Sequence, residues 1–176
     1  MRQRIYEMKK KVIEQEIWKL LESVSDPEIP VLSVIDLGII RSVTIKEQHS
    51  DSANYQLVIT ITPTYTGCPA MDMISNQISS RLMEAGYQSF EIKQTLKPAW
   101  TTDWLTEVGK EKLISYGIAA PVGKSFDNSR LSNLKISCPQ CGSENTNLIS
   151  EFGSTACKAL FKCLACLEPF DYFKCH

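Results

Sequence analysis

Apolar residues in the first part of the chain recur first at helical and then at strand spacing. Over residues 6–24 they fall three or four positions apart, which predicts an amphipathic helix with a charged outer face. Asp26 precedes a proline, and the residue before a proline avoids the α region, so the helix should end there. Short strands are expected over residues 31–40 and 42–46, and a central β-branched strand over residues 55–62.

A second helix and a further strand complete the predicted first domain. The helix is indicated by apolar residues at helical spacing: Met71, Ile74, Ile78 and Leu82. Gly86 should close it, and residues 89–96 alternate in the manner of a strand. A third helix is expected over residues 103–116, with Thr102 as its N-cap. The order of helix, strands, helix and strand predicts a small α/β (α+β) domain.

Composition changes after the third predicted helix. Residues 120–135 are rich in Pro, Gly, Ser and Asn, which is typical of a linker. We therefore expect an α/β domain over residues 1–119 that includes the third helix, a linker over residues 120–135, and a small module over residues 136–176.

Four of the seven cysteines form two C-x₂-C pairs in that small module: Cys138 with Cys141, and Cys163 with Cys166. Two such pairs that face each other make a tetrahedral site of four sulfurs, which is a geometry that Zn²⁺ prefers. Because four protein ligands leave no position for water or substrate, the pattern predicts a structural zinc ribbon. Iron in the same four ligands is the alternative.

The remaining candidates for metal ligands are weaker. Cys157 lies between the two pairs, and Cys175 and His176 end the sequence. C-x₂-C turns close a site better than an isolated cysteine does, so the two pairs remain the expected ligand set. His49 lies in a predicted polar turn.

Charge and composition narrow the class of protein. The 176 residues are 43% hydrophobic and 22% charged, with a formal net charge of −1. These values are typical of a globular protein, and no apolar run approaches the roughly 20 residues of a membrane span. No export signal is evident, and seven cysteines suit a reducing compartment, so a cytoplasmic location is expected. From residue 136 onward three lysines face four acidic residues, which argues against a nucleic-acid partner.

Cys68 forms a second candidate centre. It lies where the predicted central strand gives way to a helix, with Gly67 before it and Pro69 in the first helical turn. Free N–H groups at a helix start favour a thiolate, and such positions can lower the pKa of a cysteine below about 8.5. A buried, inert cysteine is the competing interpretation. Asp26 and Glu28 are turn residues in one interpretation, and neighbours of Cys68 in the other.

Three segments together resemble a known family. They are residues 26–30 (Asp-Pro-Glu-Ile-Pro), residues 34–40 (Val-Ile-Asp-Leu-Gly-Ile-Ile) and residues 66–69 (Thr-Gly-Cys-Pro). The combination resembles the small iron–sulfur assembly proteins that include bacterial SufT. Residues 98–104 and the segments around Cys138, Cys157 and Phe170 also resemble the phenylacetate-degradation PaaD family, which is encoded beside the multicomponent phenylacetyl-CoA epoxidase.

The resemblance implies an accessory role without catalysis of its own. Such a protein would help to assemble or insert an iron–sulfur cluster, and its partners would be oxygenase or reductase subunits of the epoxidase and other iron–sulfur assembly proteins. By position, Cys68 matches the family's reactive cysteine, and Asp26 and Glu28 match its acidic signature. One thiolate cannot hold a cluster alone, so a transient cluster would need a second copy in a homodimer, thiols of a partner or a small thiol.

The sequence leaves two other classes of function open. A nucleic-acid-binding or generic protein-docking zinc ribbon would use the C-terminal module alone, and a cysteine enzyme would need a base that the two histidines hardly provide. For docking, the sequence offers an aromatic group on the ribbon, namely Phe170, Tyr172 and Phe173. The competing interpretation, which we favour, is that these rings pack against the ribbon's own strands.

Overall fold

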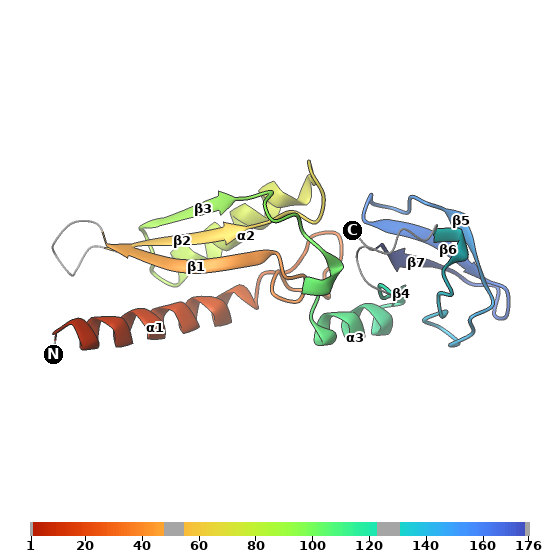
Figure 1. Cartoon of the computed structure of the whole chain (residues 1–176), viewed down its shortest axis with the longest axis horizontal. Helices are drawn as coiled ribbons and strands as arrows, with labels where there is room; N and C mark the ends of the chain where they lie inside the picture. The colour runs from red at the N-terminus through yellow and green to blue at the C-terminus, as the bar shows by residue number, and fades with distance from the viewer. Residues whose placement is uncertain (1, 48–54, 123–130, 175–176) are drawn as a thin grey trace. The chain divides into compact units, whose positions relative to one another are not determined.

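The computed structural model describes residues 2–47, 55–122 and 131–174. Its contacts divide the chain into two compact units, Met1–Ala99 and Trp100–His176 (Figure 1). The predicted turn that contains His49 and most of the predicted linker lie outside the described residues. Among the described helices, none combines the length and the apolar character that crossing a bilayer would take.

The first unit has the predicted order of elements, which confirms the expected fold class. It comprises α1 (Arg2–Leu21), β1 (Ile40–Glu47), β2 (Tyr55–Ile61), α2 (Ala70–Glu84) and β3 (Phe90–Gln94). The sheet order is β1-β2-β3, with β1 antiparallel and β3 parallel to β2. A parallel pair needs a crossover connection, which α2 supplies behind the strands in Figure 1.

Alternation along β2 places the core of this unit on one face of the sheet. Leu57, Ile59 and Ile61 are fully buried, and they lie two positions apart as the strand period requires. The helices cover this face with aliphatic side chains: Ile17 and Leu21 from α1, and Ile74, Ile78 and Leu82 from α2. The first unit thus has a continuous aliphatic core of its own.

The strand predicted over residues 31–40 is wrong for most of its length. Residues 30–38 form turns and bends with one isolated β-bridge from Ser33 to Ser25, and only Ile40 enters β1. Side chains replace the ladder here, because the Asp36 carboxylate accepts hydrogen bonds from the backbone N–H and hydroxyl of Ser33, both at 2.9 Å. Gly38 then turns the chain with a positive φ of 64°. Most apolar side chains of this segment are buried without a strand: Leu32, Val34, Leu37 and Ile39.

The second unit begins with short helices and continues as a sheet. It comprises the 3₁₀ helix η1 (Thr102–Trp104), α3 (Glu107–Ser115), β4 (Ile118–Ala119), the 3₁₀ helix η2 (Leu131–Asn133), β5 (Thr146–Ser150), β6 (Lys158–Cys163) and β7 (Pro169–Phe173). The strand order is β4-β7-β6-β5. Because β4 pairs with β7, α3 and β4 group with the ribbon, whereas the sequence-based boundaries placed them in a domain that ends at residue 119.

The helix predicted over residues 103–116 is split in two. Thr101, and not Thr102, caps η1 by accepting a hydrogen bond from the Asp103 N–H at 3.0 Å. Thr106 then starts α3, since its hydroxyl accepts from the Gly109 N–H at 2.9 Å. Each threonine satisfies an N–H group that a helix start leaves unpaired.

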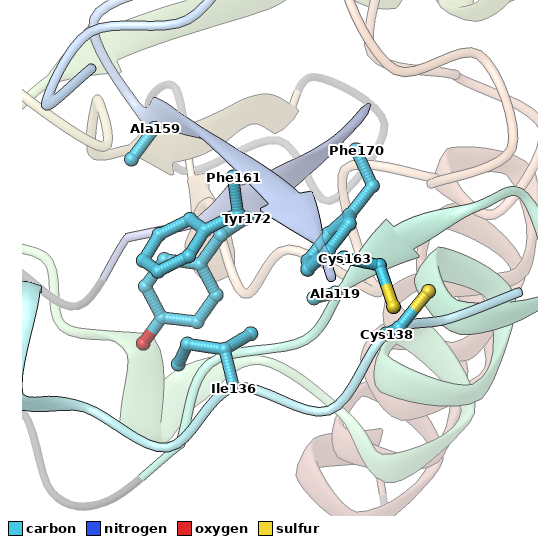
Figure 2. Packing of buried hydrophobic residues seen from close by; sticks show 8 residues of the cluster. All are labelled: Ala119, Ile136, Cys138, Ala159, Phe161, Cys163, Phe170 and Tyr172. Carbon is cyan, nitrogen blue, oxygen red and sulfur yellow. The ribbon is translucent and has the colours of Figure 1, made fainter. Parts of the chain in front are cut away.

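The ribbon encloses a small aromatic core, drawn in Figure 2. Phe161 stacks on Phe170 at a centroid separation of 6.0 Å and meets Tyr172 edge-on at 5.6 Å. Phe170, Tyr172 and Phe173 are only 5%, 0% and 1% exposed. Of the two interpretations of these rings, packing against the ribbon's own strands is therefore confirmed, and an exposed aromatic docking surface is excluded.

Candidate metal centre and cysteine site

Four thiols converge at one end of the ribbon. Cys138 and Cys141 lie in the turn before β5, Cys163 ends β6, and Cys166 lies in the turn before β7. Their Sγ atoms all lie within 4.8 Å of one another. Figure 2 shows the sulfurs of Cys138 and Cys163 directed at each other from different segments.

The spacing of the sulfurs fits a tetrahedral metal ion. Cys138 Sγ lies 3.8 Å from Cys166 Sγ, and Cys141 Sγ lies 3.6 Å from Cys163 Sγ. With bonds of about 2.3 Å from zinc to sulfur, an ideal tetrahedron separates its sulfurs by about 3.8 Å. The four cysteines therefore form a group suited to a metal ion, in which no position stays open for a substrate.

Two turns of the same form build this group. The Cys138 N–H donates to the Ser143 carbonyl, and the Cys163 N–H donates to the Glu168 carbonyl, both at 2.9 Å and both five residues ahead. In each turn the residue after the second cysteine is left-handed: Gly142 has a φ of 73° and Leu167 has a φ of 69°. The same backbone geometry thus shapes both C-x₂-C turns.

The electrostatics of the group favour a thiolate at Cys163. The backbone N–H of Cys166 points at the Cys163 sulfur at 3.5 Å. This hydrogen bond is the largest influence on the pKa of Cys163, which lies at about 6. Since metals bind thiolates, this shift favours the binding form of Cys163, whereas burial and hydrogen bonds with the neighbouring sulfurs raise the pKa of Cys166.

Cys157 does not belong to this group. It lies just before β6, at the end of that strand opposite Cys163. Its buried sulfur lies 3.0 Å from the Thr155 hydroxyl. Cys175 and His176 lie outside the described residues.

Cys68 lies in the first unit, between β2 and α2. Its N–H donates to the Tyr65 carbonyl at 3.2 Å, and its own carbonyl accepts from the Met71 N–H at 3.3 Å. Pro69 already has helical angles, with a φ of −69° and a ψ of −20°. Cys68 therefore lies directly before Pro69, the N-cap of α2, and its side chain is partly exposed.

The thiol of Cys68 is harder to ionise than an ordinary cysteine, contrary to the expectation for a helix start. Partial burial raises its pKa most, and the negative charges of Glu28 and Asp26 raise it further. Hydrogen bonds from the Ala70 N–H and from Tyr65 act in the opposite direction but are outweighed. A partner that brings positive charge would therefore activate this thiol.

The two predicted carboxylates act on Cys68, and one of them also shapes its own turn. Asp26 accepts the backbone N–H groups of Glu28 and Ile29 at 2.9 and 2.7 Å. Asp26 thus has the turn role and also lies within electrostatic range of the thiol. Sequence reasoning missed Tyr65, whose side chain bonds to Cys68, because nothing in a loop residue three positions earlier signals that contact.

Comparison with known proteins defines the class. The sequence profile of the family described as "Iron-sulfur cluster assembly protein" matches residues 14–86, and that of the "PaaD zinc beta ribbon domain" matches residues 124–174. The chain is 34% identical to an "Fe-S protein maturation auxiliary factor" of Porphyromonas gingivalis, over 53% of this chain and 84% of that protein. The crystal structure titled "Domain of Unknown Function DUF59" from Bacillus anthracis superposes with a TM-score of 0.53 at 26% identity, and covers 60% of this chain and 95% of that one.

A relative that matches almost the whole chain identifies the family of this protein more closely. The chain is 48% identical to a protein of Escherichia coli that is named as a putative component of 1,2-phenylacetyl-CoA epoxidase, over 91% of this chain and 92% of that protein. The chain belongs to this PaaD family, which joins an iron–sulfur assembly domain to a zinc ribbon. The resemblance seen in the sequence is thereby confirmed.

Proposed function

We propose that this protein is an accessory maturation factor of a multicomponent phenylacetyl-CoA epoxidase, and that it helps to place an iron–sulfur cluster in the reductase component. One observation carries the proposal: a partly exposed thiol, Cys68, lies at a helix start beside Asp26 and Glu28. The relatives named for the epoxidase and for iron–sulfur maturation support the same role.

Cys68 acts in this proposal by ligand exchange. Its thiol loses a proton as its sulfur bonds to an iron of the incoming cluster, which is the cargo, and the thiolate of the cluster source that held this iron leaves with that proton. A cysteine of the client then loses its proton and bonds to that iron, the bond to Cys68 breaks, and Cys68 takes up the released proton. No electron is transferred, and the client supplies the remaining thiolates.

The second unit has a structural role in the proposal. Cys138, Cys141, Cys163 and Cys166 would hold a Zn²⁺ ion, because their spacing fits it and no ligand position stays open. When bound, the ion joins the two cysteine turns to the aromatic core. The chain itself has no catalytic role.

A client-loading assay tests the proposal. The purified reductase component without its cluster is mixed with a cluster source and with wild-type protein, Cys68→Ser or Cys157→Ser, and its iron, sulfide and visible absorption are followed. Cys68→Ser is expected to reduce the loading rate to the rate without added protein. Cys157→Ser is the matched control, because it removes a lone cysteine that belongs to neither candidate site.

Equal loading by wild type and Cys68→Ser would refute the role of Cys68. The zinc content and secondary structure of both variants should match those of wild type, because a loss of cluster loading could otherwise result from misfolding.

A further inference from the structure

The two cysteine turns of the metal group share a backbone but differ in surface chemistry. Both have the same hydrogen bond from the first cysteine to the residue five positions on, and both have a left-handed residue after the second cysteine. The first turn carries Pro139, Gln140 and Gly142, whereas the second carries Leu164, Ala165 and Leu167. The metal group itself thus gives no reason for leucines in the second turn.

Leu167 is unfavourable in two independent ways. Its φ of 69° is a conformation that a bulky residue rarely adopts, and it is the non-glycine residue with positive φ in the described part of the chain. Its side chain is also 64% exposed to solvent. Glycine meets the same backbone requirement at position 142, so the leucine at 167 is not required by the fold.

Other exposed apolar groups surround Leu167. Leu164 is 42% exposed, and Ala165 and Pro169 are also exposed. We call Leu164, Ala165 and Leu167 the leucine patch. A strained backbone and exposed apolar surface on one turn are typical of a contact site.

The charges beside the leucine patch indicate the chemistry of what it contacts. Glu168 follows Leu167 directly, and Glu144 precedes Asn145, whose carbonyl accepts the Leu164 N–H at 2.8 Å. Neither glutamate forms an ion pair with any residue that the structure describes. Lys162 is the neighbouring base, so carboxylates outnumber ammonium groups two to one.

We propose that the leucine patch is the surface by which this protein docks on its client, and that the client presents an apolar patch bordered by basic side chains. The inference rests on the proposed function for the identity of the client. The leucine patch, and not the buried aromatic residues, is then the docking face of the ribbon. Apolar anchors surrounded by complementary charge are the usual form of a protein contact.

Binding of the purified reductase component, measured by calorimetry with the zinc-loaded full-length chain, tests the inference. Leu167→Gly and Leu167→Asn both suit a left-handed backbone, and each is expected to weaken binding about tenfold or more. Both variants should keep the zinc content and a melting temperature at or above that of wild type. Ile149→Thr is the matched control, because Ile149 is 54% exposed on β5 of the same unit and should bind as wild type.

The charge requirement is tested in the same assay. Glu168→Lys should weaken binding, and added salt should weaken the wild-type complex, since the client's rim is basic. Unchanged affinity of both Leu167 variants, or no measurable binding by wild type, would overturn the inference. Wild-type self-association that Leu167→Asn abolishes, seen by sedimentation, would also overturn it, because the patch would then bind a second copy.

The two proposals fail separately. If Cys68→Ser loads clusters normally but Leu167→Asn loses the client, the docking surface stands and the role of Cys68 falls. If Cys68→Ser fails to load the client while the Leu167 variants bind as wild type, the role of Cys68 stands and the docking surface falls.

Discussion

The four thiols of the second unit and the single thiol of Cys68 show how differently one side chain behaves in two environments. In the ribbon, sulfurs lie 3.6–3.8 Å apart in pairs, and a backbone N–H group lowers the pKa of Cys163 to about 6, while burial and hydrogen bonds with its neighbouring sulfurs raise the pKa of Cys166. At Cys68, partial burial and two carboxylates raise the pKa. Neighbouring groups, rather than the motif, therefore decide whether a cysteine is ready to bind a metal or held back.

The two units also differ in what stabilises them. The first has a continuous aliphatic core between its sheet and two helices. The second has a smaller aromatic core, and its two cysteine turns lie at one end of it. This difference predicts that the two units respond differently to loss of metal and to loss of core volume.

Removal of the metal should have the largest effect on the stability of the chain. A strong chelator, or Cys138→Ser, is expected to unfold the ribbon and leave the first unit folded, because binding of structural zinc contributes roughly 10–16 kcal/mol to the folding of small modules. Calorimetry of the full-length chain should then lose one of two transitions. A chelated chain that keeps both transitions would show that the metal does not maintain the ribbon.

Truncation in the first core should have the next largest effect. Ile59→Ala removes a fully buried side chain from β2 and should cost about 2–5 kcal/mol of unfolding free energy in the first unit. Zinc per chain should not change. Thr60→Ala is the control, because Thr60 is on the opposite face of the same strand and should cost less than about 1 kcal/mol. Equal losses from both variants would contradict the assigned core face.

Removal of one charge beside Cys68 should have the smallest effect. The negative charge of Glu28 raises the pKa of Cys68, so Glu28→Gln should lower that pKa and increase the thiolate fraction at pH 8. Alkylation of Cys68 should then be about two- to threefold faster, since one pKa unit corresponds to a tenfold change. Glu84→Gln, at the far end of α2, should leave the rate unchanged. A slower alkylation rate in Glu28→Gln would contradict the claim that Glu28 raises the pKa of Cys68.

Sequence reasoning succeeded where spacing alone determines geometry. The two C-x₂-C pairs predict a four-sulfur group, and the structure brings these sulfurs together. The helices α1 and α2 and the strand β2 follow from their apolar periods.

Sequence reasoning failed where tertiary contacts override the local pattern of residues. Residues 31–38 are apolar and β-branched enough for a strand, yet the Ser33–Asp36 hydrogen bonds close a turn there. For Phe170 and Tyr172 both exposure and packing stayed open, because the alternation of a short strand does not show what covers each face. The pKa of Cys68 depends on Glu28 and Asp26, which lie about 40 residues earlier in the sequence and meet it only in the fold. Alignment of the two cysteine turns with each other would have singled out Leu167 opposite Gly142.

The division between a metal-bound quartet and one available thiol is tested most directly by alkylation of the native, zinc-loaded protein at pH 9, with mass spectrometry of each cysteine. Among the six described cysteines, Cys68 should be modified first, and Cys138, Cys141, Cys163 and Cys166 should react only after a chelator is added. Modification of the quartet without chelator at the rate of Cys68, or a Cys68 that stays unmodified, would contradict the account.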